Sequence, residues 1–180
     1  RGFFAQLCSL KIPNFLVTTS GSIEEDIMKS AGEKFLIFNF DADDVQLHEK
    51  GENRVGNLLI KTESYMKFED LMQKYLLEIY KKEKRLSPSE LLKEIGLKIK
   101  DKNSILYQAA KNDVSVFCPG IVDSSFGFHL FMFQQKHPDF IIDSIWDMGK
   151  ITTQLSFGDK KAVISLGGGI SKHYSIFSAL

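Results

Sequence analysis

Short apolar runs that alternate with longer helical patterns are the feature of this sequence that most limits its fold. Four runs of four or five residues are rich in β-branched and aromatic side chains, which is typical of buried strands. They lie at Phe15–Thr18, Phe35–Phe38, Val114–Phe117 and Ala162–Leu166. Strands that alternate with helices usually build a parallel sheet covered by helices. The sequence therefore predicts a parallel α/β fold.

The stretch between the second and third runs is predicted to be mostly helical. Ser87–Glu90 combines a capping residue, a proline and a carboxylate, the signals of a helix start. A helix over residues 126–133 has no polar face, so we expect it to be buried on nearly all sides, inside the domain or at a subunit contact. An apolar stripe at helical spacing indicates core packing rather than a cofactor site, and it consists of Phe68, Leu71, Met72, Tyr75, Leu76 and Ile79.

Composition and charge exclude several classes of protein. The chain has 180 residues, 43% of them apolar, and we expect one domain over residues 1–180 that is truncated at both ends. Basic and acidic residues balance at 23 each, which gives no electrostatic case for binding nucleic acid or an anionic membrane. No apolar run reaches the ~18 residues of a membrane span. Cys8 and Cys118 lack metal-ligand spacing, so we expect a cytoplasmic protein with buried thiols and no metal.

The last apolar run leads straight into Gly167, Gly168 and Gly169 and then into a helix that carries Lys172 and His173. Glycines at such a junction let a phosphate approach the backbone, and the helix directs free N–H groups toward it. This pattern indicates a nucleotide site, although a tight turn between a strand and a helix explains it equally well. His173 stands where an imidazole can move protons near neutral pH.

Polar residues also follow the first run, as Thr18-Thr19-Ser20-Gly21 and then Ser22-Ile23-Glu24-Glu25-Asp26. Ser22 and Glu25 match a capping box, which by itself would explain the acids. Alternatively, Glu24 and Glu25 receive a cationic substrate while the turn at residues 19–21 faces a nucleotide, because open parallel sheets bind ligands at the carboxyl ends of their strands.

The third run ends in Cys118-Pro119-Gly120 and leads to Asp123 before the next helix. Asp123 is expected either to cap that helix or to hydrogen-bond a ribose hydroxyl, and the residues alone favour neither role. The other histidines, His48, His129 and His137, lack metal-ligand spacing and are expected to be surface or packing residues.

Several of these segments together resemble the deoxyhypusine synthase family, in the same order along essentially the whole chain. The matching segments are residues 16–26, residues 53–59 with Tyr65 and Phe68-Glu69, residues 116–119 leading to Asp123, and Leu166-Gly167-Gly168-Gly169 with Lys172-His173. Linked motifs at consistent spacing are much more specific than any one of them.

The resemblance implies an NAD-dependent transferase with a Rossmann-like fold, assembled as a tetramer with active sites at subunit contacts. In that family hydride passes from spermidine to NAD, an enzyme lysine captures the aminobutyl group as an imine, and the group reaches a lysine of the translation factor 5A precursor. By position, the resemblance implies that NAD contacts Thr19, Ser20, Gly21, Glu25 and Asp123, and that spermidine contacts Glu24, Glu25 and His173. His173 would take the amine proton, which eases hydride loss from the neighbouring carbon.

Two departures from the family pattern keep other functions open. Phe128 stands where many members have a spermidine-binding aspartate, and the family's lysine nucleophile belongs to a segment beyond Leu180. The chain alone is therefore expected to be inactive. One alternative is a catalytically inactive paralogue that completes the sites of an active homologue in a heterotetramer. Another is a generic NAD-binding α/β domain that does not couple NAD to spermidine.

Overall fold

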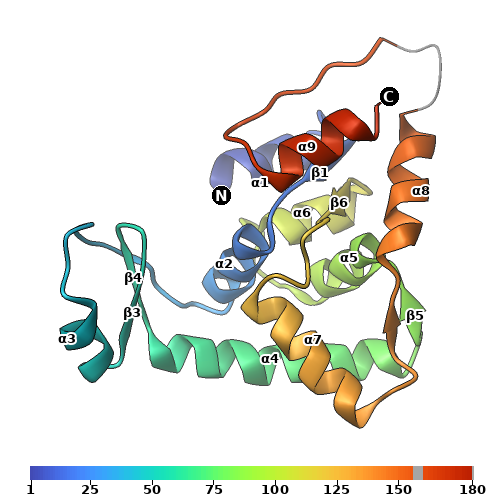
Figure 1. Cartoon of the computed structure of the whole chain (residues 1–180). Coiled ribbons are helices and arrows are strands. Elements are labelled where there is room, and N and C mark those ends of the chain that lie inside the picture. Colours follow the sequence, from blue (N-terminus) through green and yellow to red (C-terminus); the bar gives the residue numbers. More distant parts are fainter. Residues whose placement is uncertain (156–159, 180) are drawn as a thin grey trace.

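A computed structural model describes residues 1–155 and 160–179, and Figure 1 shows how its elements are arranged. The protein has a mixed α/β fold in which parallel strand pairs are flanked by helices, as the sequence predicted. The strands are β1 (Phe15–Val17), β2 (Leu36–Ile37), β3 (Glu52–Val55), β4 (Leu58–Lys61), β5 (Arg85–Leu86), β6 (Ser115–Phe117) and β7 (Ile141–Ile142). The helices are α1 (Gly2–Ser9), α2 (Ser20–Ser30), α3 (Asp44–Glu49), α4 (Thr62–Tyr80), α5 (Pro88–Lys98), α6 (Ile105–Asn112), α7 (Ser125–Lys136), α8 (Ser144–Gln154) and α9 (Ile170–Phe177).

The central strand pair is β1 and β6, which run parallel with Leu16 opposite Val116. The pairing continues past the strand end, where the Thr18 N–H donates to the Phe117 carbonyl at 2.9 Å. Both carboxyl ends therefore lie together, and we call this the β1–β6 edge. The second parallel pair joins β5 to β7, with Leu86 opposite Ile142.

Two of the four expected strands differ from the prediction. Leu36–Ile37 is a strand, but it pairs antiparallel with β4 in a separate three-stranded sheet and leaves Ile37 85% exposed. Residues 162–166 pair with no strand among the described residues, and Ile164 is 88% exposed. An apolar, β-branched run favours an extended backbone, but whether it pairs with another strand depends on the tertiary structure.

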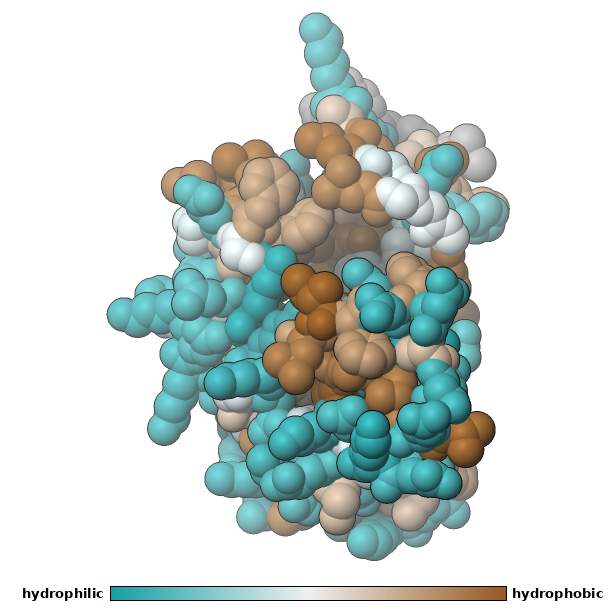
Figure 2. Space-filling model, turned by 90° about the vertical axis from the view of Figure 1, so that its left-hand side faces the viewer, coloured by the Kyte–Doolittle hydropathy of each residue, from teal (hydrophilic) through white to brown (hydrophobic). Residues whose placement is uncertain are grey.

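The antiparallel sheet and α3 form a hairpin arm, residues 36–61, at the amino-terminal end of α4 (Figure 1). The family-like segment at residues 53–59 forms its β3–β4 turn, where Arg54 binds both Asp44 (2.8 Å) and the Gly56 carbonyl (2.9 Å). Figure 2 views the molecule from the side of this arm and shows exposed hydrophobic side chains in the middle of that face.

The expected apolar stripe of α4 and the expected start of α5 are confirmed. In α4 the side chains of Phe68, Met72, Leu76 and Ile79 are all at most 2% exposed. Burial of such a side chain is worth ~1.5–3 kcal/mol, so this stripe is a main source of stability. The capping box before α5 is also present, because Ser87 accepts from the Glu90 N–H and donates its own N–H to the Glu90 carboxylate.

Helix α7 is less buried than its sequence suggested. Its inner face contains Phe126, which is fully buried, whereas Phe128, Phe131 and Met132 are 40–58% exposed. The lack of a polar face therefore does not mean burial on all sides within this chain. Cys8 and Cys118 are buried and free, and burial raises the pKa of their thiols to about 11 and about 12.

Candidate functional site

Helix α2 starts directly at the β1–β6 edge. Thr19 is its N-cap, with an extended backbone, and Ser20 is the first helical residue. The Ser20 hydroxyl lies 3.5 Å from the Gly120 carbonyl, in the loop that follows β6. A Cβ on Gly21 would have no heavy atom within 4 Å, so the backbone at this turn is open to a ligand.

The predicted capping box of Ser22 and Glu25 is wrong. Because α2 begins two residues before Ser22, both residues lie inside the helix, and the Glu25 carboxylate pairs with Lys29 one turn later at 2.9 Å. The Ser22 hydroxyl lies 3.4 Å from that of Thr19. Glu25 is therefore half-buried near the middle of α2, where it pairs with Lys29.

Glu24 points toward a different helix. Its Oε1 accepts a hydrogen bond from the Phe126 N–H, in the first turn of α7, at 2.8 Å. A carboxylate at a helix N-terminus is stabilised by the free N–H groups and by the helix dipole. One oxygen of this acidic side chain is thus engaged within the protein.

The third acid of the run, Asp26, has a structural role that the sequence analysis did not assign. It is 2% exposed and accepts from the Ser104 hydroxyl (2.7 Å) and the Leu106 N–H (2.9 Å), at the start of α6, while Arg1 pairs with it at 2.6 Å. The sequence contains a signal for this buried role, because the apolar residues Ile23 and Ile27 place position 26 on the buried face of α2.

Asp123 lies in the loop between β6 and α7 and is exposed. It does not cap α7, because Ser124 is the N-cap and its hydroxyl accepts from the Gly127 N–H at 2.9 Å. The interpretation of Asp123 as a cap is therefore wrong. Its contact with a ribose stays a prediction.

The glycine-rich turn also reaches this edge. Gly167 and Gly169 have φ values of +93° and +79°, a left-handed conformation that L side chains rarely adopt, and α9 begins at Ile170. A Cβ on Gly120 would lie 3.4 Å from the Ile170 side chain, so the start of α9 packs beside the loop after β6. The glycines precede a helix, as predicted, but an unpaired segment stands in place of the predicted strand among the described residues.

His173 is exposed on α9 and its ring stacks on Phe177, with centroids 6.1 Å apart. Within residues 1–155 and 160–179, no hydrogen bond or ion pair joins His173 to Glu24 or Glu25. The structure thus brings the two helices to one edge of the fold without forming a closed pocket between these side chains.

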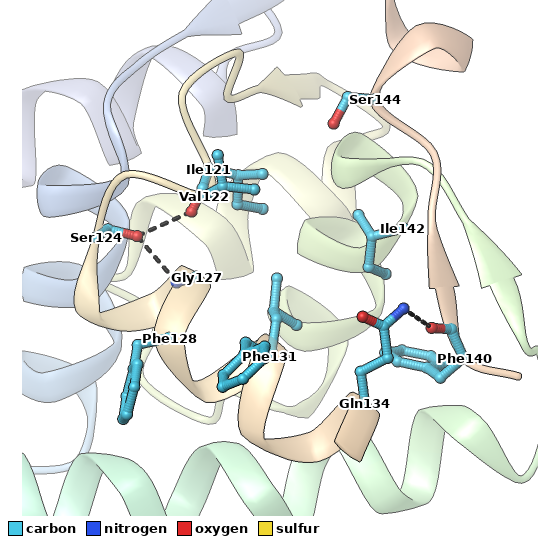
Figure 3. Close-up of a pocket in the computed structure, with 11 residues that line it drawn as sticks. Ile121, Val122, Ser124, Gly127, Phe128, Phe131, Gln134, Phe140, Ile142 and Ser144 are labelled. Carbon is cyan, nitrogen blue, oxygen red and sulfur yellow. Dashed lines mark hydrogen bonds between the residues drawn. The ribbon is translucent and has the colours of Figure 1, made fainter. Parts of the chain in front are cut away.

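A separate cavity of about 470 Å³ lies between the loop that joins β6 to α7, helix α7 itself and the segment around β7 (Figure 3). It is lined by Ile121, Val122 and Ser124 of the loop and by Phe128 and Phe131 of α7, among others. None of the predicted contact residues lines it. The cavity is mostly apolar, and Phe128 contributes an aromatic ring where many family members have an acid.

Two titratable side chains near the acidic pair, Tyr65 and His129, have shifted pKa values. Burial raises the pKa of Tyr65, and the nearby charges of Glu24 and Glu25 raise it further. Burial lowers the pKa of His129, against the opposite effect of Glu69 and Glu24, and its Nδ1 has no hydrogen-bond partner. The packing role expected for His129 is confirmed by its 7% exposure.

The described residues form neither a metal centre nor a membrane-spanning helix. In the part of the chain that the structure describes, no group of three His, Cys, Asp or Glu side chains is arranged to hold a metal ion. The same residues include no helix with both the length and the apolar character to cross a bilayer.

Comparison with known proteins shows the same family throughout. The family model described as deoxyhypusine synthase matches residues 1–180. The chain is 39% identical over 178 residues to a probable deoxyhypusine synthase of Thermoplasma volcanium, and 41% identical over 179 residues to one of Sulfurisphaera tokodaii, covering 98% of this chain and 57% of each relative. A probable deoxyhypusine synthase of Drosophila melanogaster is 35% identical over 163 residues, which are 88% of this chain and 44% of that protein.

A solved structure agrees with these matches. The crystal structure of a putative deoxyhypusine synthase from Entamoeba histolytica has a TM-score of 0.65 and 25% identity, over 86% of this chain and 48% of that chain. The chain thus spans little more than half the length of the archaeal relatives, 57% in each case. With the family model matched over all 180 residues, the chain belongs to the deoxyhypusine synthase family of transferases.

Proposed function

We propose that this chain is the NAD-binding α/β domain, over residues 1–180, of a deoxyhypusine synthase. The reaction is the NAD-dependent transfer of the aminobutyl group of spermidine to a lysine of the translation factor 5A precursor, in the cytoplasm. The observation that carries the proposal is the meeting of the β1–α2 turn and the glycine-rich turn before α9 at the β1–β6 edge, with the acidic α2 on one side and α9 on the other. The family match over the whole chain favours this function over a generic NAD-binding domain.

The residues at this edge fit a dinucleotide. Thr19 and Gly21 are exposed and offer a hydroxyl and N–H groups, whereas Ser20 is 5% exposed with its hydroxyl beside the Gly120 carbonyl. Glu25 and Asp123 offer carboxylates to ribose hydroxyls. The hydroxyls of Ser125 and Ser171, in the first turns of α7 and α9, are buried and have no hydrogen-bond partner among the residues that the structure describes. Such unpaired groups are costly, which supports a polar ligand at these helix starts. NAD would supply the hydride acceptor there and return the hydride after transfer.

The acidic side of the edge fits a polyamine. Spermidine is a flexible polycation, and its recognition requires carboxylates that are not already neutralised. Among the described residues, only one Glu24 oxygen accepts a hydrogen bond, and Glu25 pairs only with Lys29, in a partly exposed i,i+4 pair that is weak. His173 is accessible and takes the amine proton from the substrate.

The surface of the chain supports assembly into a tetramer, either of one chain or with an active homologue. Its accessible surface is 10,955 Å², whereas a compact monomer of 20.4 kDa exposes roughly 8,800 Å². Several of the exposed large side chains are apolar, including Phe128 and Phe131 on α7. Apolar surface of this extent favours burial against another subunit.

The test uses the full-length protein that contains this chain, with NAD, spermidine and the precursor protein. Mass spectrometry is expected to show addition of one aminobutyl group to one lysine. His173→Ala is expected to lower the rate at least tenfold with little change in NAD affinity, because the imidazole moves a proton and does not hold the dinucleotide. His48→Ala, on the hairpin arm, is the matched control and keeps full activity.

Three outcomes would contradict parts of this proposal. An unmodified precursor at saturating NAD and spermidine would exclude the reaction. Modification only when an active homologue is added would identify the chain as the inactive paralogue. NAD binding by calorimetry that is the same with and without spermidine would point to a generic NAD domain.

A further inference from the structure

A side chain of α2 caps a helix that starts about a hundred residues later in the sequence. Glu24 Oε1 accepts from the Phe126 N–H at 2.8 Å, across a sequence separation of 102 residues. Phe126 is the second residue of α7, and the first four N–H groups of a helix have no partner within the helix. Since Phe126 is fully buried, its N–H needs an acceptor from elsewhere, and Glu24 supplies it.

The first helical turn of α7 is also tightly joined to the loop that precedes it. The Ser124 hydroxyl accepts from the Gly127 N–H and donates to the Ile121 carbonyl, both at 2.9 Å (Figure 3). A Cβ on Gly127 would lie 2.6 Å from the Ile121 and Val122 carbonyl oxygens, so the loop rests directly on the helix. This loop and the first turn of α7 therefore move as one unit.

Asp123 belongs to that unit, and its N–H donates to the Gly120 carbonyl at 3.2 Å. The only other bond from α2 to the loop, among the described residues, is the long one from the Ser20 hydroxyl to the Gly120 carbonyl at 3.5 Å. The short, charged bond from Glu24 is the stronger link between α2 and the unit.

We infer that Glu24 is a positioning residue for Asp123: its bond to the Phe126 N–H fixes the distance between the Thr19–Gly21 turn and Asp123. The ligand roles of these residues rest on the proposed function, but the bond itself does not. The two sides of the edge come from α2 and from the loop before α7, and a dinucleotide that contacts both requires a fixed spacing. Glu24 thus acts on NAD affinity through hydrogen bonding, in addition to facing the polyamine through its charge.

Two substitutions separate these roles. Glu24→Gln keeps the length of the side chain and an oxygen that accepts a hydrogen bond, but removes the charge. Glu24→Ala removes both. Glu25→Ala is the matched control, because Glu25 is the next residue on α2 and its bond goes to Lys29.

The first measurement is residue-resolved amide exchange of the full-length protein by NMR, without ligand. In Glu24→Ala the Phe126 amide is expected to exchange about five- to thirtyfold faster, the ratio that corresponds to loss of a cap worth ~1–2 kcal/mol. The amide chemical shift of Asp123 is expected to move with it. In Glu24→Gln both the Phe126 exchange rate and the Asp123 chemical shift are expected to stay close to the wild-type values. Glu25→Ala is expected to leave the Phe126 exchange rate unchanged.

The second measurement is NAD affinity by calorimetry. Glu24→Ala is expected to weaken NAD binding about tenfold and Glu24→Gln by less than threefold, whereas both weaken spermidine binding. Unchanged Phe126 exchange in Glu24→Ala, or equal loss of NAD affinity in both variants, would overturn the inference. If the wild-type protein binds no NAD, the proposed function fails, and the exchange rate of Phe126 together with the Asp123 shift still decides the positioning role.

Discussion

The β1–α2 turn and the glycine-rich turn before α9, which meet at the β1–β6 edge, are built in different ways. On the α2 side, β1 pairs with β6, and the acids of α2 bind the starts of α6 and α7. On the α9 side, residues 162–166 have no partner strand among the described residues, and α9 itself has no buried side chain. The first turn is thus held by long-range hydrogen bonds of this chain, whereas the second is held, among the described residues, by packing such as that of Ile170 beside Gly120. We expect substitutions to affect stability strongly on the α2 side and weakly on the α9 side.

Asp26→Ala has the largest expected effect. It leaves the Ser104 hydroxyl, the Leu106 N–H and the Arg1 guanidinium without their shared acceptor in a site that is 2% exposed. Loss of a buried charged partner costs ~3–5 kcal/mol. Urea unfolding should show this decrease, with Glu25→Ala as the control that changes stability by less than ~0.5 kcal/mol. A loss below 1 kcal/mol for Asp26→Ala would show that α2 is not the stable side of the edge.

Gly127→Ala tests the contact between α7 and the loop that carries Asp123. The new Cβ would lie 2.6 Å from the carbonyl oxygens of Ile121 and Val122, and such overpacking costs ~1–3 kcal/mol. Gly149→Ala in α8 is the matched control, because nothing lies within 4 Å of that Cβ and an alanine in a helix gains up to ~1 kcal/mol. The midpoint temperature of thermal unfolding should therefore fall for Gly127→Ala and rise for Gly149→Ala. Equal changes in the midpoint temperature would mean that the loop between β6 and α7 moves away from the new Cβ at little cost in stability.

Much of the fold was readable from local sequence. The α4 stripe, the Ser87–Glu90 capping box and the β1 and β6 strands all follow from periodicity or from a short motif, and all are present. These features depend on residues within one or two helical turns, where a single sequence carries enough information. The resemblance added the family, which the comparisons confirm.

The errors have a common cause, because each depends on partners far away in the chain. The antiparallel partner of Leu36–Ile37 lies across the hairpin arm, and the acceptor for the Phe126 N–H lies on α2. Local signals suggested that Glu25 and Asp123 cap their own helices, yet Thr19 and Ser124 occupy the N-cap positions. The choice among nearby polar residues depends on where the helix starts, which tertiary packing decides.

Val163→Thr has the smallest expected effect and bears most directly on the comparison. Valine and threonine have nearly the same shape, so the substitution changes only whether a hydroxyl is buried. Val116 in β6 is 5% exposed and Val163 is 54% exposed, although the sequence predicted a buried strand at both positions. Val116→Thr should cost ~1–3 kcal/mol in urea unfolding of the isolated chain, and Val163→Thr less than ~0.5 kcal/mol. If the two variants lost the same stability, residues 162–166 would be buried in solution and the two turns would be alike. If the difference instead disappeared only in the assembled full-length protein, the segment would gain its partner there, and the α9 side of the site would be completed by assembly.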